Sequence, residues 1–436
     1  MTRIRLYTLM PWTLLLVIGL GVGQFAVSPQ VGGRPDTPPG VTRSMQRFLD
    51  DREPIQDLAP MALTPCVSGF AGPYPCNNVD LMAFMPLSTI GGGSGADIWG
   101  WTDAGTDKEY ALMARSSGIS FVDISDPVNP IYLGNLPTNT LATSWRDVDV
   151  YANHAFIVAD FAGNHGMQVF DLTQLRDVNN PPVTFSETAH YSGFNTAHTV
   201  TINPDTGFAY AAGSDTCNGG LHMVNIQNPT APTFAGCYDG DGYTHETQCV
   251  IYHGPDVQHQ GKEICFASNE DTLTIVDVTN KSAPVQLSRT GYPRSGYTHQ
   301  GWLTENHRYF VLDDELDEEI YGHNTLTRFF SVADLDAPTL RFIYTGPTPA
   351  IDHNLYVKGG FVYQANYRAG LRILKPPRTE VAYFDIYPAN DIASFNGAWG
   401  NYPFFDSGLV VVSGIEQGLF ILRPNLPPSA TDWMND

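Results

Sequence analysis

The chain has 436 residues, of which 42% are hydrophobic and 12% aromatic, and this composition excludes a disordered protein. Its 45 acidic residues against 23 basic ones give a formal net charge of −22, which argues against a nucleic-acid partner and against a polybasic membrane-binding surface. The 41 glycines and 32 prolines favour many short strands joined by turns over long helices.

The start of the chain has the pattern of an export signal. Arg3 and Arg5 precede an apolar run from Leu9 to Val22, and no acidic residue occurs before Asp36. A basic start followed by a short apolar stretch is typical of a secretory signal peptide, which we place at residues 1–26. Because the run is short for a membrane-spanning helix, an uncleaved anchor is the weaker interpretation. We therefore expect a secreted protein, periplasmic or extracellular, with no stable membrane span after signal removal.

The segment that follows is expected to be a linker. Residues 27–63 are rich in proline, glycine and polar residues, with one helical turn near Met45–Leu49. We expect the folded region at residues 64–424 and a C-terminal tail at residues 425–436.

Export makes the six cysteines candidates for disulfide bonds, since disulfides persist in oxidising compartments. Six cysteines permit fifteen connectivities. Sequential pairing is favoured because each pair is then local to one loop or hairpin: Cys66–Cys76, Cys217–Cys237 and Cys249–Cys265. The alternative is free thiols, while the lack of a CxxC pair gives cysteine metal ligation little support.

One phrase recurs seven times, beginning with GISFVDIS at Gly118–Ser125. Steps of 43 to 54 residues separate its equivalent positions: Val122, Phe170, Val224, Val276, Phe330, Ile373 and Ile421. A fixed period of about fifty residues indicates a radial or solenoid array. Two short runs precede each phrase, and in most copies another follows a proline-containing turn. Four short strands in each of seven repeats predict an all-β, seven-bladed β-propeller.

The two ends of the repeat region are expected to meet. The seventh copy ends near Pro424 and lacks a fourth strand, whereas an unmatched strand at Val79–Leu87 precedes the first complete repeat. We expect this N-terminal strand to complete the last blade, which leaves no unpaired edge at the join. The tail would then lie outside the ring.

The phrase FVDISDPVNPIYLG at residues 121–134 resembles the LVIVD repeat of secreted bacterial proteins. The sequences at residues 66–84, 91–103 and 269–279 are similar to the choice-of-anchor B family, and the resemblance extends over residues 64–424. It implies a β-propeller and export, but no activity, because the family has no established one. Its members carry varied C-terminal anchors. This tail has no sortase-type motif, apolar helix or basic cluster, which favours a released or periplasmic protein.

Histidines recur at one phase of the repeat, each opening the innermost strand of its blade: His198, His245, His299 and His353. Innermost strands line the channel of a propeller, so these side chains are candidate metal ligands at the channel mouth. Imidazole suits Zn, Cu, Fe or Ni. The alternative is that each histidine braces its own blade through hydrogen bonds, which repetition by phase also predicts.

The turns between second and third strands should reach the same face. They supply further candidate ligands: Glu270, Asp313, Asp314 and Glu416. Other polar residues are expected to line a pocket there: Arg146, Asp147, Arg368, Tyr243 and Tyr297. The acidic run Asp313–Glu319 is a candidate Ca²⁺ site, since Ca²⁺ takes six to eight oxygen ligands. It lacks the spacing of an EF-hand, and a solvated acidic loop is the favoured interpretation.

Three functions fit these features. The favoured one is a secreted binding or scaffold module at or outside the cell envelope, because a rigid ring presents loops and loops carry recognition. Its partner would be an extracellular protein or a small molecule. The alternative is a metal-dependent oxidase or hydrolase with a histidine-lined site, to which no catalytic residue is assigned. A structural adhesin of the cell surface is the third.

Overall fold

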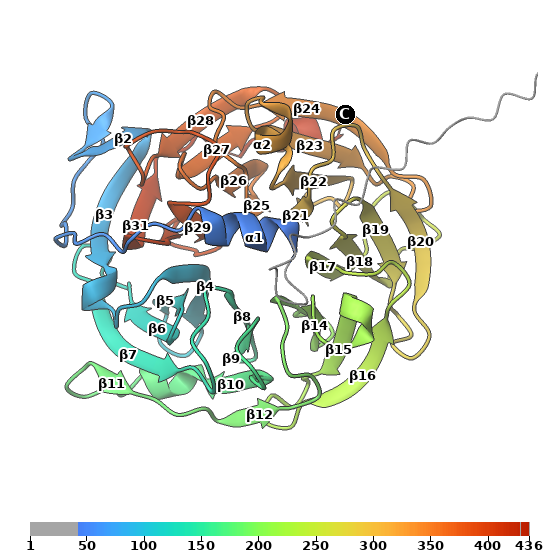
Figure 1. The fold of residues 1–436 in the computed structure, drawn as a ribbon, viewed down its shortest axis with the longest axis horizontal. Helices are drawn as coiled ribbons and strands as arrows, with labels where there is room; N and C mark the ends of the chain where they lie inside the picture. Colours follow the sequence, from blue (N-terminus) through green and yellow to red (C-terminus); the bar gives the residue numbers. More distant parts are fainter. Residues whose placement is uncertain (1–41, 428, 436) are drawn as a thin grey trace, which may run out of the picture. The chain divides into compact units, whose positions relative to one another are not determined.

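The computed structural model describes residues 42–427 and 429–435, and a compact unit begins at Ser44. The expected signal peptide at residues 1–26 lies outside the described residues. Within them, seven mainly antiparallel sheets surround a common centre (Figure 1). The first strands of neighbouring blades contact one another around that centre. The predicted all-β, seven-bladed propeller is confirmed.

Blades 1 to 4 follow the chain, and in each the first strand is innermost. Blade 1 contains β4 (Gly95–Asp103), β5 (Lys108–Arg115), β6 (Gly118–Asp123) and β7 (Ile131–Pro137), with the parallel β11 (Val183–Thr184) at its outer edge. Blade 2 contains β8 (Arg146–Tyr151), β9 (His154–Ala159), β10 (Met167–Asp171) and β12 (Ala189–Tyr191). Blade 3 contains β13 (Thr199–Asn203), β14 (Phe208–Ala212), β15 (Leu221–Asn225) and β16 (Thr233–Tyr238). Blade 4 contains β17 (Glu246–Ile251), β18 (Glu263–Ser268), β19 (Leu273–Asp277) and β20 (Val285–Thr290).

Blades 5 to 7 complete the ring. Blade 5 contains β21 (Thr298–Leu303), β22 (Tyr309–Asp314), β23 (Leu326–Ser331) and β24 (Thr339–Thr345). Blade 6 contains β25 (Leu355–Lys358), β26 (Phe361–Ala365), β27 (Leu371–Lys375) and β28 (Thr379–Phe384), extended by β2 (Tyr74–Asn77) and β1 (Phe70–Ala71). Blade 7 contains β29 (Ala398–Tyr402), β30 (Val410–Gly414), β31 (Gly418–Pro424) and β3 (Val79–Pro86). The helical segments are α1 (Arg43–Asp50), α2 (Asp317–Tyr321), η1 (Leu87–Thr89), η2 (Leu172–Leu175), η3 (Cys217–Gly219) and η4 (Thr431–Asn435).

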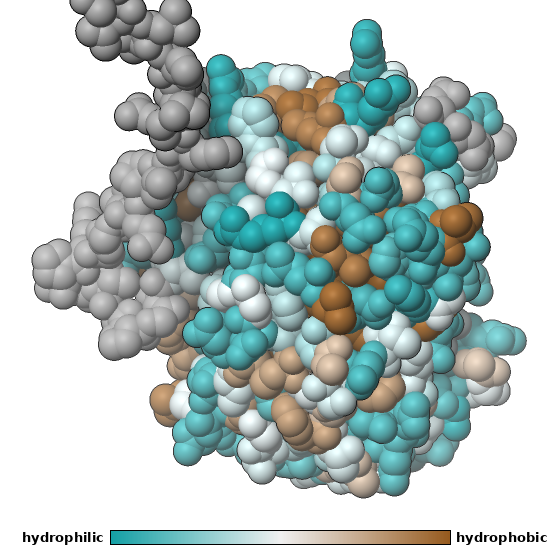
Figure 2. Space-filling view, turned by 90° about the vertical axis from the view of Figure 1, so that its right-hand side faces the viewer, coloured by the Kyte–Doolittle hydropathy of each residue, from teal (hydrophilic) through white to brown (hydrophobic). Residues whose placement is uncertain are grey.

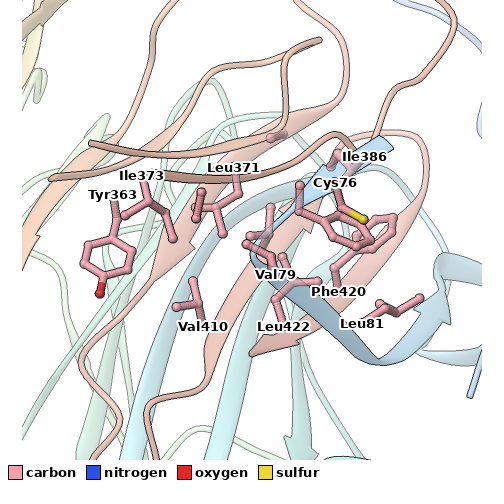
Figure 3. Close-up of a cluster of buried hydrophobic side chains, with 14 of the residues drawn as sticks. Cys76, Val79, Leu81, Tyr363, Leu371, Ile373, Ile386, Val410, Phe420 and Leu422 are labelled. Atoms are coloured by element: carbon pink, nitrogen blue, oxygen red, sulfur yellow. The ribbon is translucent and has the colours of Figure 1, made fainter. Parts of the chain in front are cut away.

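Blade 7 joins the two ends of the ring, as expected. Strand β3 pairs antiparallel with β31 in a register that runs from Val79 opposite Pro424 to Pro86 opposite Gly418. The blade therefore takes three strands from the end of the repeat region and its outer strand from the beginning. The side chains of blades 6 and 7 share one hydrophobic core at this seam (Figure 3).

The disulfide bonds in the described residues follow the sequential pairing: Cys66–Cys76, Cys217–Cys237 and Cys249–Cys265. The first ties the segment before β1 to β2, and the third joins the neighbouring strands β17 and β18. Three disulfides indicate folding in an oxidising environment.

Side chains hold the innermost strands together, because these strands have no backbone partner on the channel side. An Asp147 carboxylate oxygen accepts a hydrogen bond from the Val200 N–H at 2.6 Å, which joins blades 2 and 3. The Gln248 side-chain oxygen accepts from the Leu303 N–H at 2.7 Å, which joins blades 4 and 5. Polar residues of the inner strands thus satisfy buried backbone donors that would otherwise lack partners.

The described segments on either side of the repeat region pack against the ring. Helix α1 occupies the place of the single predicted turn, and its Phe48 is 3% exposed. In the C-terminal tail, Trp433 is buried against Tyr309, Phe329 and Phe342 of blade 5. Among the described residues, no helix is long and apolar enough to cross a bilayer. On the face shown in Figure 2, hydrophobic residues lie in small separate groups.

A buried histidine should make the stability depend on pH. In β15, His222 Nε2 lies 2.8 Å from the Tyr191 hydroxyl and Nδ1 lies 2.7 Å from the Thr216 hydroxyl. Burial lowers the pKa of His222 to about 4. On acidification, His222 therefore takes up its proton in the unfolded chain before it does so in the folded protein. Between about pH 6.5 and about pH 4, each lower pH unit should reduce the free energy of unfolding by at most about 1.4 kcal/mol.

Denaturant unfolding at several pH values checks this prediction. The acid-dependent loss should be smaller in His222→Gln, whereas the exposed control His190→Gln should retain the slope of the wild type. Equal pH slopes in all three proteins would contradict the prediction.

Candidate metal centre in the central channel

Four buried imidazoles stand side by side around the channel. Their ring centroids are separated by 4.3 Å (His198 and His245), 4.2 Å (His245 and His299) and 4.4 Å (His299 and His353). Each lies at the start of an innermost strand, in blades 3 to 6. The repeat places them together because equivalent positions of successive blades face the same end of the channel.

One nitrogen of each ring already has a partner. His198 Nδ1 lies 3.3 Å from a carboxylate oxygen of Asp160, and His299 Nδ1 lies 3.1 Å from one of Asp313. His245 Nδ1 lies 3.1 Å from the His299 carbonyl oxygen, and His353 Nδ1 contacts the Trp399 carbonyl oxygen. Since a carbonyl oxygen only accepts, the Nδ1 atoms of His245 and His353 carry the hydrogen and their Nε2 atoms keep a lone pair. Contacts that brace the blades therefore also orient the rings as metal ligands are oriented.

A carboxylate completes the group. Glu315 follows β22, and its Oε1 atom lies 3.8 Å from His299 Nε2 and 3.6 Å from His353 Nε2. The ligand atoms of His245, His299 and Glu315 all lie within 4.8 Å of one another. The Tyr367 hydroxyl donates to Oε1 at 2.6 Å, and Ser44 of α1 donates to Oε2. Sequence reasoning selected the neighbouring Asp313 and Asp314 as ligands instead.

Burial keeps this group near neutrality. Burial, reinforced by the neighbouring histidines, lowers the pKa of His245 and of His299 well below the ordinary value. Burial also lowers the pKa of His353 to about 3. It raises the pKa of Glu315 to about 7. Neutral imidazoles are the form that binds metals, so these rings are available as ligands at neutral pH.

A small space lies beside the four histidines, with Glu315 outside its lining, and α1 packs against two tryptophans at its edge. A cavity of about 20 Å³, the size of one ion or water, has a mostly polar lining: Asp97, Trp145, Arg146, Asp147, His198, Thr199, His245, Glu246, His299, His353, Asn354 and Trp399. Figure 1 shows α1 across the centre of the ring. The Phe48 ring lies 5.6 Å from Trp145 and 5.5 Å from Trp399, centroid to centroid, so the helix covers the cavity.

The next layer of the channel is acidic. Asp97, Asp147, Asp149 and Glu246 line a second space of about 10 Å³. Burial, together with the charge of Asp147 and a hydrogen bond to it, raises the pKa of Asp97 well above its ordinary value. Burial raises the pKa of Asp149 to about 8.

The other predicted pocket residues divide between the channel and the blades. Arg146 and Asp147 line the cavity. The Tyr297 ring lies 5.3 Å from that of His245. Burial and the nearby carboxylates raise the pKa of Tyr243 well above its ordinary value. Arg368 instead binds Glu53 and Asn396, outside the cavity lining.

The further candidate ligands hold the structure around the centre. Asp313 orients His299, as described. Asp314 accepts hydrogen bonds from the Tyr297 N–H at 2.7 Å and the Tyr292 hydroxyl at 2.7 Å. Glu416 accepts from the Gly397 N–H at 3.0 Å and the Asn396 amide at 3.1 Å. Glu270 pairs through its backbone with Thr298.

The interpretation of residues Asp313–Glu319 as a solvated loop is wrong. Most of its carboxylates are buried: Asp313, Asp314, Glu315, Asp317 and Glu318. The run folds inward because β22 continues to Asp314 and the short α2 begins at Asp317, which places the acidic side chains between blades. The dense charge suggested exposure, but the partners that allow burial come from distant parts of the chain.

The seven sheets around this channel define a β-propeller. Its blades contain LVIVD repeats, since the family model of the LVIVD repeat matches residues 108–138, 206–240 and 255–290. The fold is similar to the β-propeller domain of Cps50 (Swd1) from Myceliophteria thermophila, with 12% identity, a TM-score of 0.51 and coverage of 76% of this chain and 97% of that one. At this identity the likeness concerns the fold alone.

A functionally unknown protein from Desulfotomaculum acetoxidans is also similar, with 10% identity, a TM-score of 0.48 and coverage of 73% of this chain and 94% of that one. No curated protein matches the chain.

Proposed function

We propose that this protein is an exported LVIVD-repeat propeller that serves as a binding or scaffold module and holds a transition-metal ion in its channel. The observation that carries the metal is that the ligand atoms of His245, His299 and Glu315 lie within 4.8 Å of one another, while each histidine Nδ1 is already held. The charged sequence start and the resemblance to the choice-of-anchor B family support export, as do the three disulfides.

The donor set supports zinc as the ion to test. Zn²⁺ is bound tetrahedrally by imidazole nitrogen and carboxylate oxygen at about 2.0–2.2 Å. Two ligands of one tetrahedral zinc ion therefore lie about 3.3–3.6 Å apart, which is about 1 Å less than the 4.8 Å that encloses the three ligand atoms here. A small inward movement of the side chains would complete the site. His245, His299 and Glu315 are the proposed ligands, with His353 or His198 as a fourth.

A structural ion fits a binding module better than an enzyme. The cavity of about 20 Å³ has room for one ion and no organic substrate beside it, and α1 covers it. An ion held by blades 4 and 5 would fasten the inner ends of neighbouring sheets. The outer loops would then be free to carry recognition on a rigid ring.

Metal analysis of the purified chain tests the proposal. We expect about one equivalent of bound zinc after reconstitution, and its loss in the double variant His245→Gln/His299→Gln. The matched control His154→Gln/His190→Gln removes two histidines on blade 2, away from the cavity, and should keep the metal. Circular dichroism shows whether each protein is folded. Equal zinc in both variants, or a folded wild type without bound metal, would overturn the proposed site.

The covering helix should control how fast the ion exchanges. Phe48→Ala removes the side chain that packs on Trp145 and Trp399, which should weaken the docking of α1 by about 2–4 kcal/mol. We expect a chelator to remove zinc at least about tenfold faster, with unchanged stoichiometry. The control Phe234→Ala alters an exposed ring on β16 and should leave the rate as in wild type. An unchanged rate in Phe48→Ala would contradict gating by α1.

A further inference from the structure

A pocket of about 410 Å³ lies at the rim of the ring, between blades 5 and 6. Three of its lining residues, Arg341, Phe342 and Ile343, belong to β24, the outer strand of blade 5. Pro377 and Arg378 come from the turn between β27 and β28 of blade 6, and Trp433 comes from the C-terminal segment. This volume is in the range of pockets that hold small organic molecules.

The pocket exists because one turn of blade 6 is short. Seven residues separate the third and fourth strands in blades 1, 3, 4 and 5: 124–130, 226–232, 278–284 and 332–338. In blade 6 three residues, 376–378, make the same connection. The pairing at the base of the turn is equivalent, since Asp277 lies opposite Val285 in blade 4 and Lys375 lies opposite Thr379 in blade 6. The blade 6 turn therefore extends less far.

The longer turns cover the outer strand of the preceding blade. Gly236 of β16 lies so close to the blade 4 turn that a Cβ atom there would meet the Lys281 carbonyl oxygen. At the same register position of β20, the Ser288 hydroxyl donates to the Leu335 carbonyl of the blade 5 turn at 2.7 Å. The equivalent residue of β24 is Phe342. Because the blade 6 turn is short, Phe342 lines an open pocket.

Two guanidinium groups in this pocket are available to an anion. Arg341 and Arg378 are exposed, and neither has an ion pair or a hydrogen bond to another described residue. Other arginines of the same blades are paired, Arg328 with Asp317 and Arg372 with Glu380. In a chain with a net charge of −22, two arginines without a carboxylate partner in one pocket indicate that the partner is a ligand.

We propose that this pocket binds a small organic acid, with one carboxylate attached to a flat or apolar body. A guanidinium group donates two parallel hydrogen bonds to a carboxylate. Phe342, Ile343 and Trp433 provide the apolar contact for the body of the ligand. A singly charged carboxylate is favoured over a doubly charged phosphate, because the net charge of the protein repels each added negative charge.

This inference gives a ligand class to the binding module and rests on that proposed role, but not on the metal. The proposed zinc ligands do not line the pocket. The variant His245→Gln/His299→Gln should therefore bind an organic acid as the wild type does. Failure of acid binding leaves the result of the zinc analysis unchanged, and the converse also holds, so the two failures are distinguishable.

Titration with phenylacetate and with indole-3-acetate, followed by ligand-observed NMR, tests the site. We expect saturable binding of at least one acid with a Kd of about 1 mM or lower. The uncharged amide of that acid, which keeps the ring, should bind at least about tenfold more weakly. The double variant Arg341→Gln/Arg378→Gln should lose affinity for the acid by a similar factor. The control Arg52→Gln/Arg294→Gln changes the net charge equally at two exposed arginines outside the pocket and should bind as the wild type does.

The contrary results are equally definite. Absence of saturable binding of both acids to the folded wild type overturns the proposal, as does equal affinity for an acid and its amide. Loss of binding in the control, with binding retained in Arg341→Gln/Arg378→Gln, places the ligand elsewhere and also overturns it. Phenyl phosphate that binds about tenfold more tightly than phenylacetate would overturn the choice of a carboxylate. Circular dichroism verifies the fold of each variant, and Arg378→Gln alone replaces the double variant if that protein does not fold.

Discussion

Replacing Phe84 by alanine should lower the free energy of unfolding by about 3–5 kcal/mol. Phe84 lies on β3, the strand that closes the ring, and its side chain is 1% exposed. Its ring centroid is 4.5 Å from that of Phe420 on β31 and 6.4 Å from that of Tyr74 on β2. Alanine would leave a cavity at the seam where blades 6 and 7 meet, and the neighbouring aromatic rings are too constrained by strand pairing to fill it.

Urea unfolding followed by tryptophan fluorescence measures this loss. The control Phe234→Ala removes a ring that is 58% exposed on β16 and should change the free energy by no more than about 0.5 kcal/mol. A loss below about 1 kcal/mol in Phe84→Ala would mean that the seam contributes little to stability.

Replacing Glu263 by alanine should cost a similar amount, about 3–5 kcal/mol, through buried polar groups. Glu263 opens β18 of blade 4 and joins it to blade 3. One of its oxygens accepts from Asn203 at 2.7 Å and from the Tyr210 hydroxyl at 2.5 Å, and the other binds Lys281 at 2.5 Å. Alanine would leave the mostly buried ammonium group of Lys281 and the buried hydroxyl of Tyr210 without their carboxylate acceptor.

The isosteric variant Glu263→Gln separates charge from hydrogen bonding. Glutamine keeps one acceptor oxygen for Asn203 and Tyr210 but loses the ion pair with Lys281, so we expect an intermediate loss of about 1–3 kcal/mol. Equal losses in the two variants would show that the ion pair alone accounts for the effect. A negligible loss in Glu263→Ala would contradict the role of Glu263 as a junction between blades.

The fold was predictable because each blade has the same sequence pattern of short strands and turns. Val122 and Ile421, read as equivalent positions of the phrase, are both fully buried in the third strands of blades 1 and 7. The strand at Val79–Leu87 stood out because no partner was near it in the sequence, and it pairs with β31. Each repeat of about fifty residues in the sequence thus corresponds to one blade of the ring.

The candidate site was only partly predictable, since its parts do not repeat. The histidines share one phase of the blades, so the pattern identified them. Glu315 has no counterpart in that pattern, and its bond from Ser44 joins residues 271 positions apart. The helix around Phe48 was read as part of a linker because its aromatic partners, Trp145 and Trp399, cannot be found by local periodicity.

The pairing of β3 with β31 sets an order on the folding process. Strand β3 is synthesised before any complete blade, yet its partner β31 emerges last. Blades 1 to 6 have their own four strands and can pair locally, whereas closure must bring together segments separated by almost the whole ring. Such non-local pairing is intrinsically slow. Until it occurs, the apolar face of β3 is exposed, and aggregation competes with closure during this interval. Ring closure is therefore the stage of folding that is most exposed to aggregation, and a chaperone that covers β3 would act at this stage.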